Sequence, residues 1–401
     1  MQIRLGIAGY GIAAMQVIPD LKKIADKVQL TALADVRRGA LEAFQAENPN
    51  VHIFDTVEAM CTSDQVDAVW IATPNNLHAP HAIRAANNGK HVICEKPMAV
   101  TIEECQSIAE AVARNGVKYV QGHSKVFEQS IRKMRQIITS GELGKVTQIS
   151  SWNYNDWLIR ALTPTEVDTY GHGSGPVLRQ GPHQVDIVRF LGGGVVRSVK
   201  AMAGRWEPNF PKTESNYSAL LDFEDGAMAT LAFNAQGYFD ITELTWGIGE
   251  GGKKRVNADS IAPRERPPGP ISPEDKYALV AAGNPYGYGK GAGDDISAPR
   301  RQPFFGLTLV SCEHGVLRQS PDGIYVYGRD GRRELQLSPE LGRAAELVEL
   351  HDAITQDRPA VLDAAWGMAT LEVCVAILDS ARERREIMLR HQSPTRDIPG
   401  W

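Results

Sequence analysis

The sequence predicts two domains, an α/β domain built on a parallel sheet and then an α+β domain with a mainly antiparallel open sheet. The chain has 401 residues, and a single hydrophobic core stops growing at about 250–300 residues. Up to residue 122, short apolar segments alternate with amphipathic helical segments, which is typical of a parallel sheet covered on both faces. After residue 123, strand-like segments follow one another without helices between them, which indicates antiparallel pairing.

The elements of the first domain, residues 1–122, follow from hydrophobic periodicity. One helix is expected over 80–88. Another is expected over 102–114, because Thr101 can cap its N-terminus and Glu104 follows three residues later. Strands are expected at 3–8, 30–34, 52–54, 68–72, 91–94 and 118–121.

The second domain, residues 123–385, combines helices with successive strands. Asp225-Gly226 is a strong turn signal between two of these strands. Helices are expected at 130–140, 182–191, 341–357 and 364–384, and strands at 146–154, 196–205, 215–223, 227–234, 241–248 and within 307–337.

Residues 249–303 are rich in glycine and proline and interrupt this rhythm. A stretch of this length without periodicity is usually a functional lid, an oligomer arm or partly disordered. We expect an ordered arm or lid here. Residues 386–401 form a polar tail that we expect at the surface.

Composition excludes several classes of protein. A net charge of -5 gives no electrostatic reason to expect nucleic acid or an anionic membrane as partner. No apolar run approaches the roughly 18–20 residues that span a bilayer. The five scattered cysteines, with no CxxC spacing, argue against a disulfide framework and a structural zinc site.

The start of the chain and its open sheet give two further expectations. Met1 leads directly into the first predicted strand, so no signal peptide is expected and the protein should be cytoplasmic. An open sheet in the second domain needs its outer face covered, so a homodimer or homotetramer is expected.

A glycine-rich turn follows the first predicted strand. Residues 9–14 read G-Y-G-I-A-A, which has the pattern G-x-G-x-x-A. The first glycine permits the sharp bend, the second lets the backbone approach a diphosphate, and the small third residue lets the helix pack on the strand. The helix N-terminus then presents unpaired N–H groups to the diphosphate. The turn therefore predicts a Rossmann dinucleotide-binding domain, with Gly9, Gly11 and Ala14 against the coenzyme.

Asp35 lies at the end of the second predicted strand, 24 residues after Gly11. A carboxylate there accepts hydrogen bonds from the adenosine ribose and repels a 2′-phosphate, which favours NAD. Arg37 and Arg38 follow at once and could neutralise such a phosphate, so NADP stays open. We expect NAD as the coenzyme, with Asp35 and Arg37 near its adenosine ribose.

Lys96 directly follows the strand expected at 91–94, within Glu95-Lys96-Pro97. Ligands of open α/β sheets bind outside the carboxyl ends of the strands, which is where the nicotinamide should lie. The ammonium group of Lys96 can donate a hydrogen bond to the oxygen that is oxidised or reduced. The alternative is a surface lysine that pairs with Glu95.

Three motifs together resemble the Gfo/Idh/MocA family of oxidoreductases. They are the glycine turn, the loop 72–78 with the sequence A-T-P-N-N-x-H, and Glu95-Lys96-Pro97. The resemblance implies that Lys96 is catalytic and that the loop lies along the nicotinamide ribose. The further coenzyme contacts that it implies are Thr73, Pro74, Asn75, His78 and Glu95.

The family's second signature is an aspartate followed four residues later by a histidine on a helix. His183 falls on that histidine, Asp186 lies on the same helix face, and Arg179 occupies the usual aspartate position. An arginine suits a substrate carboxylate, which it can bind through two hydrogen bonds. The alternative for Arg179 is an ion pair with Asp186 or another nearby acid. His183 is the expected proton acceptor, although a histidine at a helix start can also be structural.

Segments 121–125, 153–160, 183–189 and 303–313 resemble the family branch of the phthalate 4,5-cis-dihydrodiol dehydrogenases. That resemblance implies oxidation of a carboxylated cyclic cis-diol to an aromatic dihydroxy acid, with hydride passing to NAD. The residues expected to bind such a substrate are His123, Lys125, Arg160 and Arg179.

Other functions remain open from the sequence. One is a sugar or inositol dehydrogenase of the same family, whose substrate carries only neutral hydroxyls. Another is a glycosidase that uses a tightly held NAD for transient oxidation and releases no net NADH. A non-catalytic nucleotide sensor is disfavoured by the presence of both Lys96 and His183.

Overall fold

In the computed structural model, the chain forms two compact units. The first unit contains residues 1–124, 341–371 and 396–400, and the second contains residues 125–340 and 372–395. The structure describes residues 1–122, 125–167, 173–205, 212–256, 269–282, 284, 286–287, 293–295, 297–338 and 342–397.

The first unit is built on a six-stranded sheet in the order β3-β2-β1-β4-β5-β6, and every neighbouring pair is parallel. This is the strand order of doubly wound dinucleotide-binding folds. The predicted parallel α/β domain is confirmed, and the predicted strands lie within two residues of the observed ones. The strands are β1 (Ile3–Ala8), β2 (Val28–Ala34), β3 (His52–Phe54), β4 (Ala68–Ile71), β5 (His91–Cys94) and β6 (Tyr119–Gln121).

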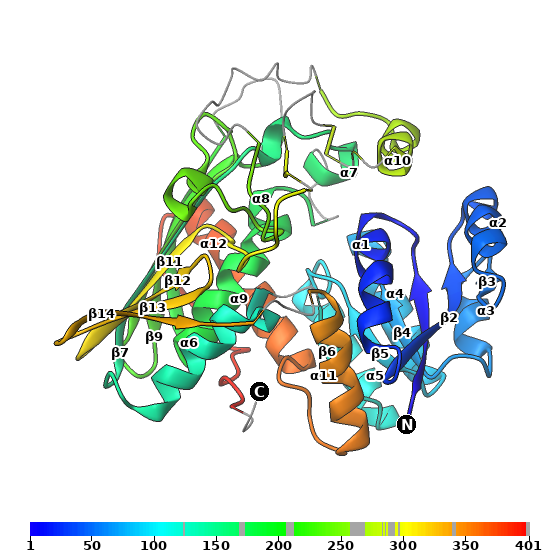
Figure 1. Cartoon of the computed structure of the whole chain (residues 1–401), viewed down its shortest axis with the longest axis horizontal. Helices are drawn as coiled ribbons and strands as arrows, with labels where there is room; N and C mark the ends of the chain where they lie inside the picture. Colours follow the sequence, from blue (N-terminus) through cyan, green and yellow to red (C-terminus); the bar gives the residue numbers. More distant parts are fainter. Residues whose placement is uncertain are drawn as a thin grey trace. The chain divides into compact units, whose positions relative to one another are not determined.

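Helices cover both faces of this sheet (Figure 1). The predicted cap is confirmed, because the Thr101 hydroxyl accepts a hydrogen bond from Glu104 N at 3.2 Å. Helix α11 comes to this unit from far along the chain. In the segment after α11, Leu362 O accepts a hydrogen bond from Gln121 N on β6 at 2.7 Å. The helices are α1 (Ile12–Leu21), α2 (Arg38–Glu47), α3 (Val57–Thr62), α4 (His78–Asn87), α5 (Ile102–Asn115) and α11 (Ala344–Thr355), with the short η1 (Lys22–Ile24) and η2 (Asn75–Leu77).

The second unit is built on a nine-stranded sheet in the order β14-β13-β12-β11-β7-β10-β9-β8-β15. Its neighbouring strands are antiparallel except β7 and β10, which are parallel, so the predicted mainly antiparallel sheet is confirmed. The Asp225-Gly226 turn joins β9 to β10, with Gly226 at a φ of 88°. The strands are β7 (Val146–Tyr154), β8 (Val196–Gly204), β9 (Asn216–Phe223), β10 (Met228–Asn234), β11 (Leu307–Cys312), β12 (Gly315–Ser320), β13 (Gly323–Gly328), β14 (Gly331–Gln336) and β15 (Ile387–Met388).

Two helices of the second unit, α6 and α9, pack on one another and against this sheet (Figure 1). All eleven residues of α9 are buried, so it is a central core element. The helices are η3 (Lys125–Phe127), α6 (Gln129–Ser140), η4 (Trp157–Ile159), α7 (Pro164–Val167), α8 (Pro176–Arg179), α9 (Gly181–Leu191), η5 (Ile241–Thr245), α10 (Pro273–Ala281) and α12 (Ala364–Glu383), the last shared with the first unit.

The prediction of a strand at 241–248 is wrong, because this segment begins with the short helix η5 (Ile241–Thr245). The Asp240 carboxylate accepts a hydrogen bond from Thr242 N at 2.9 Å and so caps a helical turn. A side chain that satisfies the backbone locally competes with strand pairing. The apolar residues of this segment suggested a strand, but the preceding aspartate decides its conformation.

Helix α12 corrects the expectation that no apolar run is long enough to span a bilayer. By length and composition it could cross a membrane, but 61% of its most apolar stretch is buried inside the protein. A helix that is apolar all round is also typical of the core of a large soluble protein.

Candidate active site

The glycine turn has the geometry that a bound dinucleotide requires. Gly9 has a φ of +97°, and a Cβ there would lie 2.7 Å from Ala72 O, so no other residue fits. Gly11 precedes α1, and a Cβ on it would meet nothing within 4 Å. The backbone at Gly11 therefore stays open to a diphosphate at the helix N-terminus. Ala14 is buried on α1 and allows close packing, as expected from the pattern.

Asp35 lies just beyond β2 and ties the glycine turn to the next loop. Its carboxylate accepts hydrogen bonds from Tyr10 N at 2.7 Å and from Arg37 Nε at 2.9 Å. Burial opposes ionisation, but the Arg37 guanidinium and the backbone amides lower the pKa of Asp35 below its ordinary value. Arg38, by contrast, pairs with Glu42 and Asp55 at the surface and not with Asp35 in any contact that the structure shows. Asp35 is therefore an anion at neutral pH, which suits a ribose diol better than a 2′-phosphate.

His78 connects the loops that follow β4 and β5. It is 1% exposed, with Nδ1 2.7 Å from Pro97 O and Nε2 2.8 Å from Thr73 O. The Thr73 hydroxyl lies 3.1 Å from His81 Nδ1. Pro74 precedes η2 and Asn75 begins it, with Asn75 largely buried. Because its two ring nitrogens contact backbone carbonyls of both loops, His78 holds these loops together.

Lys96 follows β5 as a partly exposed residue between buried neighbours. The carboxylate of the preceding Glu95 pairs with Arg343 and accepts a hydrogen bond from Trp70 Nε1 at 3.3 Å. The predicted coenzyme residues of the first unit thus gather beyond the carboxyl ends of β1, β2, β4 and β5.

In the second unit, Arg179 ends α8 and His183 lies in the first turn of α9. His183 is 4% exposed, and its ring centroid lies 4.9 Å from that of Phe305. Arg179 NH2 lies 3.5 Å from Oε1 of Glu166, a residue of α7. Asp186 is buried further along α9. Glu166 is thus one of the nearby acids that the sequence leaves open as partners of Arg179.

Glu166 also interacts electrostatically with a second cation, Lys276 of α10. Burial of the Glu166 carboxyl raises its pKa, but Arg179 and then Lys276 outweigh this and lower it below the ordinary value. Lys276 Nζ donates a hydrogen bond to Ala161 O. The insertion therefore contributes a buried lysine near Arg179. Sequence reasoning missed Lys276 because it lies 97 residues after Arg179, in a segment without periodicity.

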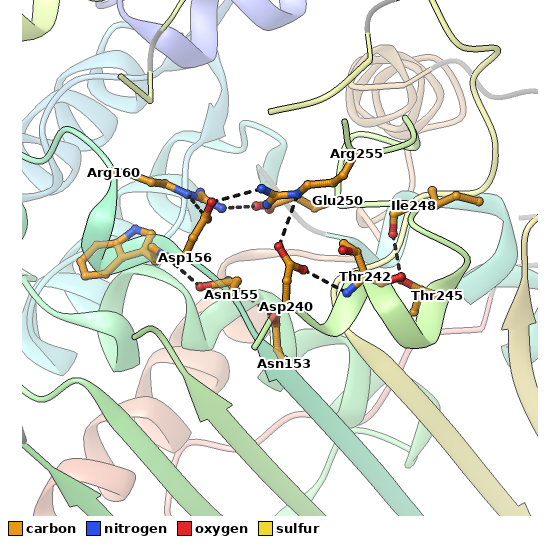
Figure 2. Close-up of polar contacts among 11 residues, drawn as sticks. Asn153, Asn155, Asp156, Arg160, Asp240, Thr242, Thr245, Ile248, Glu250 and Arg255 are labelled. Atoms are coloured by element: carbon orange, nitrogen blue, oxygen red, sulfur yellow. Dashed lines mark hydrogen bonds and ion pairs between the residues drawn. The ribbon is translucent and has the colours of Figure 1, made fainter. Parts of the chain in front are cut away.

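A buried charge network surrounds Arg160 (Figure 2). Asp156 Oδ1 lies 2.9 Å from Arg160 Nε, and Asp156 Oδ2 lies 3.1 Å from Arg255 NH1. Arg160 NH2 also lies 3.3 Å from Glu250 Oε1, and Arg255 lies 3.6 Å from Asp240. Asp156, Arg160, Asp240 and Arg255 each have a side chain no more than 8% exposed.

The network also takes in Lys125, whose Nζ donates to Glu250 O at 2.9 Å. Two residues that sequence analysis assigned to substrate, Lys125 and Arg160, thus meet at the same glutamate of the insertion. Glu250 and Arg255 were not foreseen, because their partners lie about 100 residues away in the chain. His123, the remaining residue predicted to bind substrate, lies outside the described residues.

Comparison with known proteins gives the family. Residues 3–123 match the description "Oxidoreductase family, NAD-binding Rossmann fold", and residues 131–245 match "GFO/IDH/MocA C-terminal domain". The 1-carboxy-3-chloro-3,4-dihydroxycyclohexa-1,5-diene dehydrogenase of Comamonas testosteroni is 33% identical over 383 residues, which cover 95% of both chains. The chain belongs to the Gfo/Idh/MocA family. It is an NAD-dependent oxidoreductase, as the sequence predicted.

Other members of the Gfo/Idh/MocA family are also similar. A crystal structure from Bordetella bronchiseptica RB50, of a protein assigned provisionally as a dehydrogenase, has a TM-score of 0.82 and 33% identity. The match covers 97% of this chain and 100% of the Bordetella chain. Inositol 2-dehydrogenase 2 of Saccharopolyspora erythraea is 27% identical over 247 residues, 59% of this chain and 70% of the relative.

The residues present fit the NAD of the Gfo/Idh/MocA family. The open backbone at Gly11 leaves room for a diphosphate, and the ionised Asp35 provides acceptors for ribose hydroxyls. Lys96 is the partly exposed group beyond β5, where a doubly wound sheet carries the nicotinamide.

Proposed function

We propose that this enzyme oxidises a carboxylated cyclic cis-diol of the dihydrodiol type, with NAD as hydride acceptor. The observation that carries the proposal is Arg179 at the end of α8, four residues before His183. Glu166, an acid that pairs with Arg179, also interacts with Lys276. A guanidinium at this position suits a substrate carboxylate, which it can bind through two hydrogen bonds.

The relative from Comamonas testosteroni supports the same substrate class. Its name describes a dihydroxycyclohexadiene that bears a carboxyl group. The similarity extends over 95% of this chain and so includes the segments that carry Lys96, Arg179 and His183. Substrate residues vary within a fold, so the proposal concerns the class and not the individual compound.

In the proposed mechanism, bound NAD supplies the acceptor for the hydride. Lys96 donates a hydrogen bond to the hydroxyl oxygen as it becomes a carbonyl. His183 accepts the hydroxyl proton, and Arg179 binds the substrate carboxylate. The substrate loses one hydride from carbon and one proton from oxygen. The resulting ketone then enolises to an aromatic diol, which drives the oxidation forward.

A sugar or inositol dehydrogenase is the second candidate. The relative from Saccharopolyspora erythraea is named for inositol, and the 3.5 Å contact of Arg179 with Glu166 favours an arginine that is paired internally. The two candidates differ in whether Arg179 meets a substrate charge.

A substrate panel with an Arg179 variant separates these candidates. NADH formation is measured with cyclic cis-diols that carry a carboxylate, with their amides, and with inositols. We expect the highest kcat/KM with a carboxylated diol. R179L should raise KM for that diol about 10–100-fold, the effect of a lost charge-assisted contact of about 1.5–3 kcal/mol, and should leave the amide nearly unaffected. Equal effects on both substrates would reject the carboxylate role.

A further inference from the structure

Arg343 reaches the residue next to Lys96 from a distant part of the chain. It precedes α11, 248 residues after Glu95, and its guanidinium pairs with the Glu95 carboxylate. The two side chains are only 11% and 10% exposed. Trp70 Nε1 donates to the same carboxylate oxygen at 3.3 Å, and the Arg343 guanidinium lies 5.3 Å from the Trp70 ring centroid. Glu95 is thus held by an ion pair and an indole donor, and the two residues that hold it, Arg343 and Trp70, are themselves joined by a cation–π contact.

The residue on the other side of Lys96 is also held. Pro97 O lies 2.7 Å from Nδ1 of the buried His78. Lys96 is therefore the partly exposed residue between two anchored neighbours. With the backbone fixed on both sides, the position from which the lysine side chain extends is fixed as well.

Arg343 also contacts the helix that follows the glycine turn. Its NH1 donates to Gln16 Oε1 at 3.0 Å, and its backbone N donates to Asp20 Oδ2 at 3.2 Å. Both acceptors lie on α1, whose N-terminus is the proposed diphosphate site. One side chain therefore joins the helix of the coenzyme site to the segment that carries Lys96.

We infer that Arg343 is a positioning residue, which acts through Glu95 to fix the backbone of Lys96. The inference rests on the proposed function only in that Lys96 is the group that meets the reacting oxygen. Removal of one partner of a buried ion pair leaves the other charge uncompensated, so the segment must rearrange. A displacement of about 1 Å at a catalytic group can reduce the rate about 100-fold.

The test compares R343M with a matched control, R358M. Arg358 also pairs with a buried glutamate of the same unit, at 2.7 Å from Glu349 Oε1, but that glutamate is not adjacent to Lys96. Both variants should lose thermal stability. R343M should lower kcat about 10–100-fold with a smaller change in KM for NAD, whereas R358M should keep its kcat. Equal kcat values for the two folded variants would overturn the inference.

A double-mutant cycle tests whether Arg343 acts through Glu95. E95Q removes the carboxylate charge at nearly constant shape. If the two residues act as one unit, R343M with E95Q should lower kcat about as much as either change alone. Multiplicative losses would show that Arg343 acts by another route and would overturn the inference.

A readout without substrate separates this inference from the proposed function. Lysines are labelled by reductive ¹³C-methylation, and the Lys96 signal is identified by its loss in K96R. R343M should shift the Lys96 signal, while R358M should leave it in place. An unmoved Lys96 signal in folded R343M would overturn the inference, whatever the substrate. Absence of turnover by the wild-type enzyme on the panel would reject only the proposed function.

Discussion

Lys96 is the residue on which the chemistry of this enzyme is proposed to depend. It lies beyond β5, while Glu95 and Pro97 on either side are held by Arg343 and His78. Its neighbours are buried and it is not, which is the arrangement expected for a side chain that meets a ligand.

The first prediction concerns Lys96 itself. K96A should lower kcat about 10²–10⁴-fold, the usual contribution of a positioned acid–base group, and should leave NADH binding nearly unchanged. Steady-state kinetics and NADH fluorescence titration measure the two effects. K90M is the matched control, because Lys90 Nζ donates to two backbone carbonyls in the same unit, at 2.7 and 2.8 Å. Near-normal turnover of K96A would remove Lys96 from the mechanism.

The second prediction concerns His183 as proton acceptor. A base accepts a proton only in its unprotonated form, so turnover falls on the acidic side of the pH–rate profile. H183A should abolish that acidic limb and lower kcat about 10²–10⁴-fold. D186N, a change at another buried residue of α9, should keep the limb. An acidic limb that persists in H183A would assign the base to another group.

At the residue scale, local motifs were the most predictable part of the site. Residues 9–14 and Glu95-Lys96-Pro97 are contiguous, and their positions relative to the strands follow from the pattern of the sequence. Arg343 was not predictable, because its partner lies 248 residues away. No local pattern distinguishes an arginine that pairs inside the fold from one at the surface.

At the element scale, charged side chains join the insertion to η3 and to the segment that follows β7. Glu250 contacts Arg160, and Arg255 contacts Asp156 (Figure 2). The backbone carbonyl of Glu250 also accepts a hydrogen bond from Lys125. Periodicity could not reveal this, since the insertion has none. Hydrophobic periodicity did predict the strands and helices that bury one face. It failed at 241–248, where the Asp240 cap creates a helical turn.

The third prediction is a pH dependence of the stability of this network. Burial raises the pKa of Glu250, but Arg160, Lys125 and Arg255 together lower it below the ordinary value of 4.5. A carboxyl whose pKa is lower in the folded state stabilises the fold above its unfolded pKa, and this contribution is lost as the pH falls through the folded value. E250Q should therefore be less stable than wild type at pH 7, by about 1–3 kcal/mol. The difference should shrink as the pH falls below 4.5.

Thermal unfolding of E250Q and wild type from neutral to acidic pH measures this effect. E142Q is the control, because Glu142 pairs with Arg333 at the surface, where both side chains are at least 43% exposed. An exposed pair of this kind contributes about 0–1 kcal/mol. A stability difference between E250Q and wild type that stays constant with pH would contradict the assigned role of the Glu250 charge.

At the scale of the whole molecule, the sheet of the second unit exposes large apolar side chains on one face. The strand register places Trp152, Met202, Leu220 and Met228 on the same face, and they are 45–62% exposed. Large apolar side chains that share one exposed face of a sheet are typical of a surface that another protein chain covers. We propose that this face joins two copies of the chain in a homodimer, or in a homotetramer that contains this dimer.

The fourth prediction follows from that face. L220D places a charge on β9, between β8 and β10 on this exposed face, and should convert the oligomer to monomers. Light scattering after size-exclusion chromatography gives the mass of each variant. V36D, a change at an exposed apolar residue of the first unit, should keep the wild-type mass. A monomeric wild type, or an L220D variant that stays oligomeric, would contradict this interface.

The whole-molecule organisation was only partly predictable from the sequence. The change from alternating helices and strands to successive strands after residue 123 indicates both sheets. The apolar stripe of α11 shows that one side of this helix is buried, but not against which sheet. In the structure it belongs with the first unit, and only the folded chain shows that residues 341–371 return there.

The stoichiometry of NADH formation tests the central claim most directly. The purified enzyme is incubated with excess NAD and a limiting amount of a carboxylated cyclic cis-diol until the reaction stops, and NADH and the aromatic product are both quantified. We predict one NADH and one aromatic dihydroxy acid for each molecule of diol consumed. Consumption of substrate without net NADH, or oxidation of inositols but not of the carboxylated diol, would contradict the proposed function.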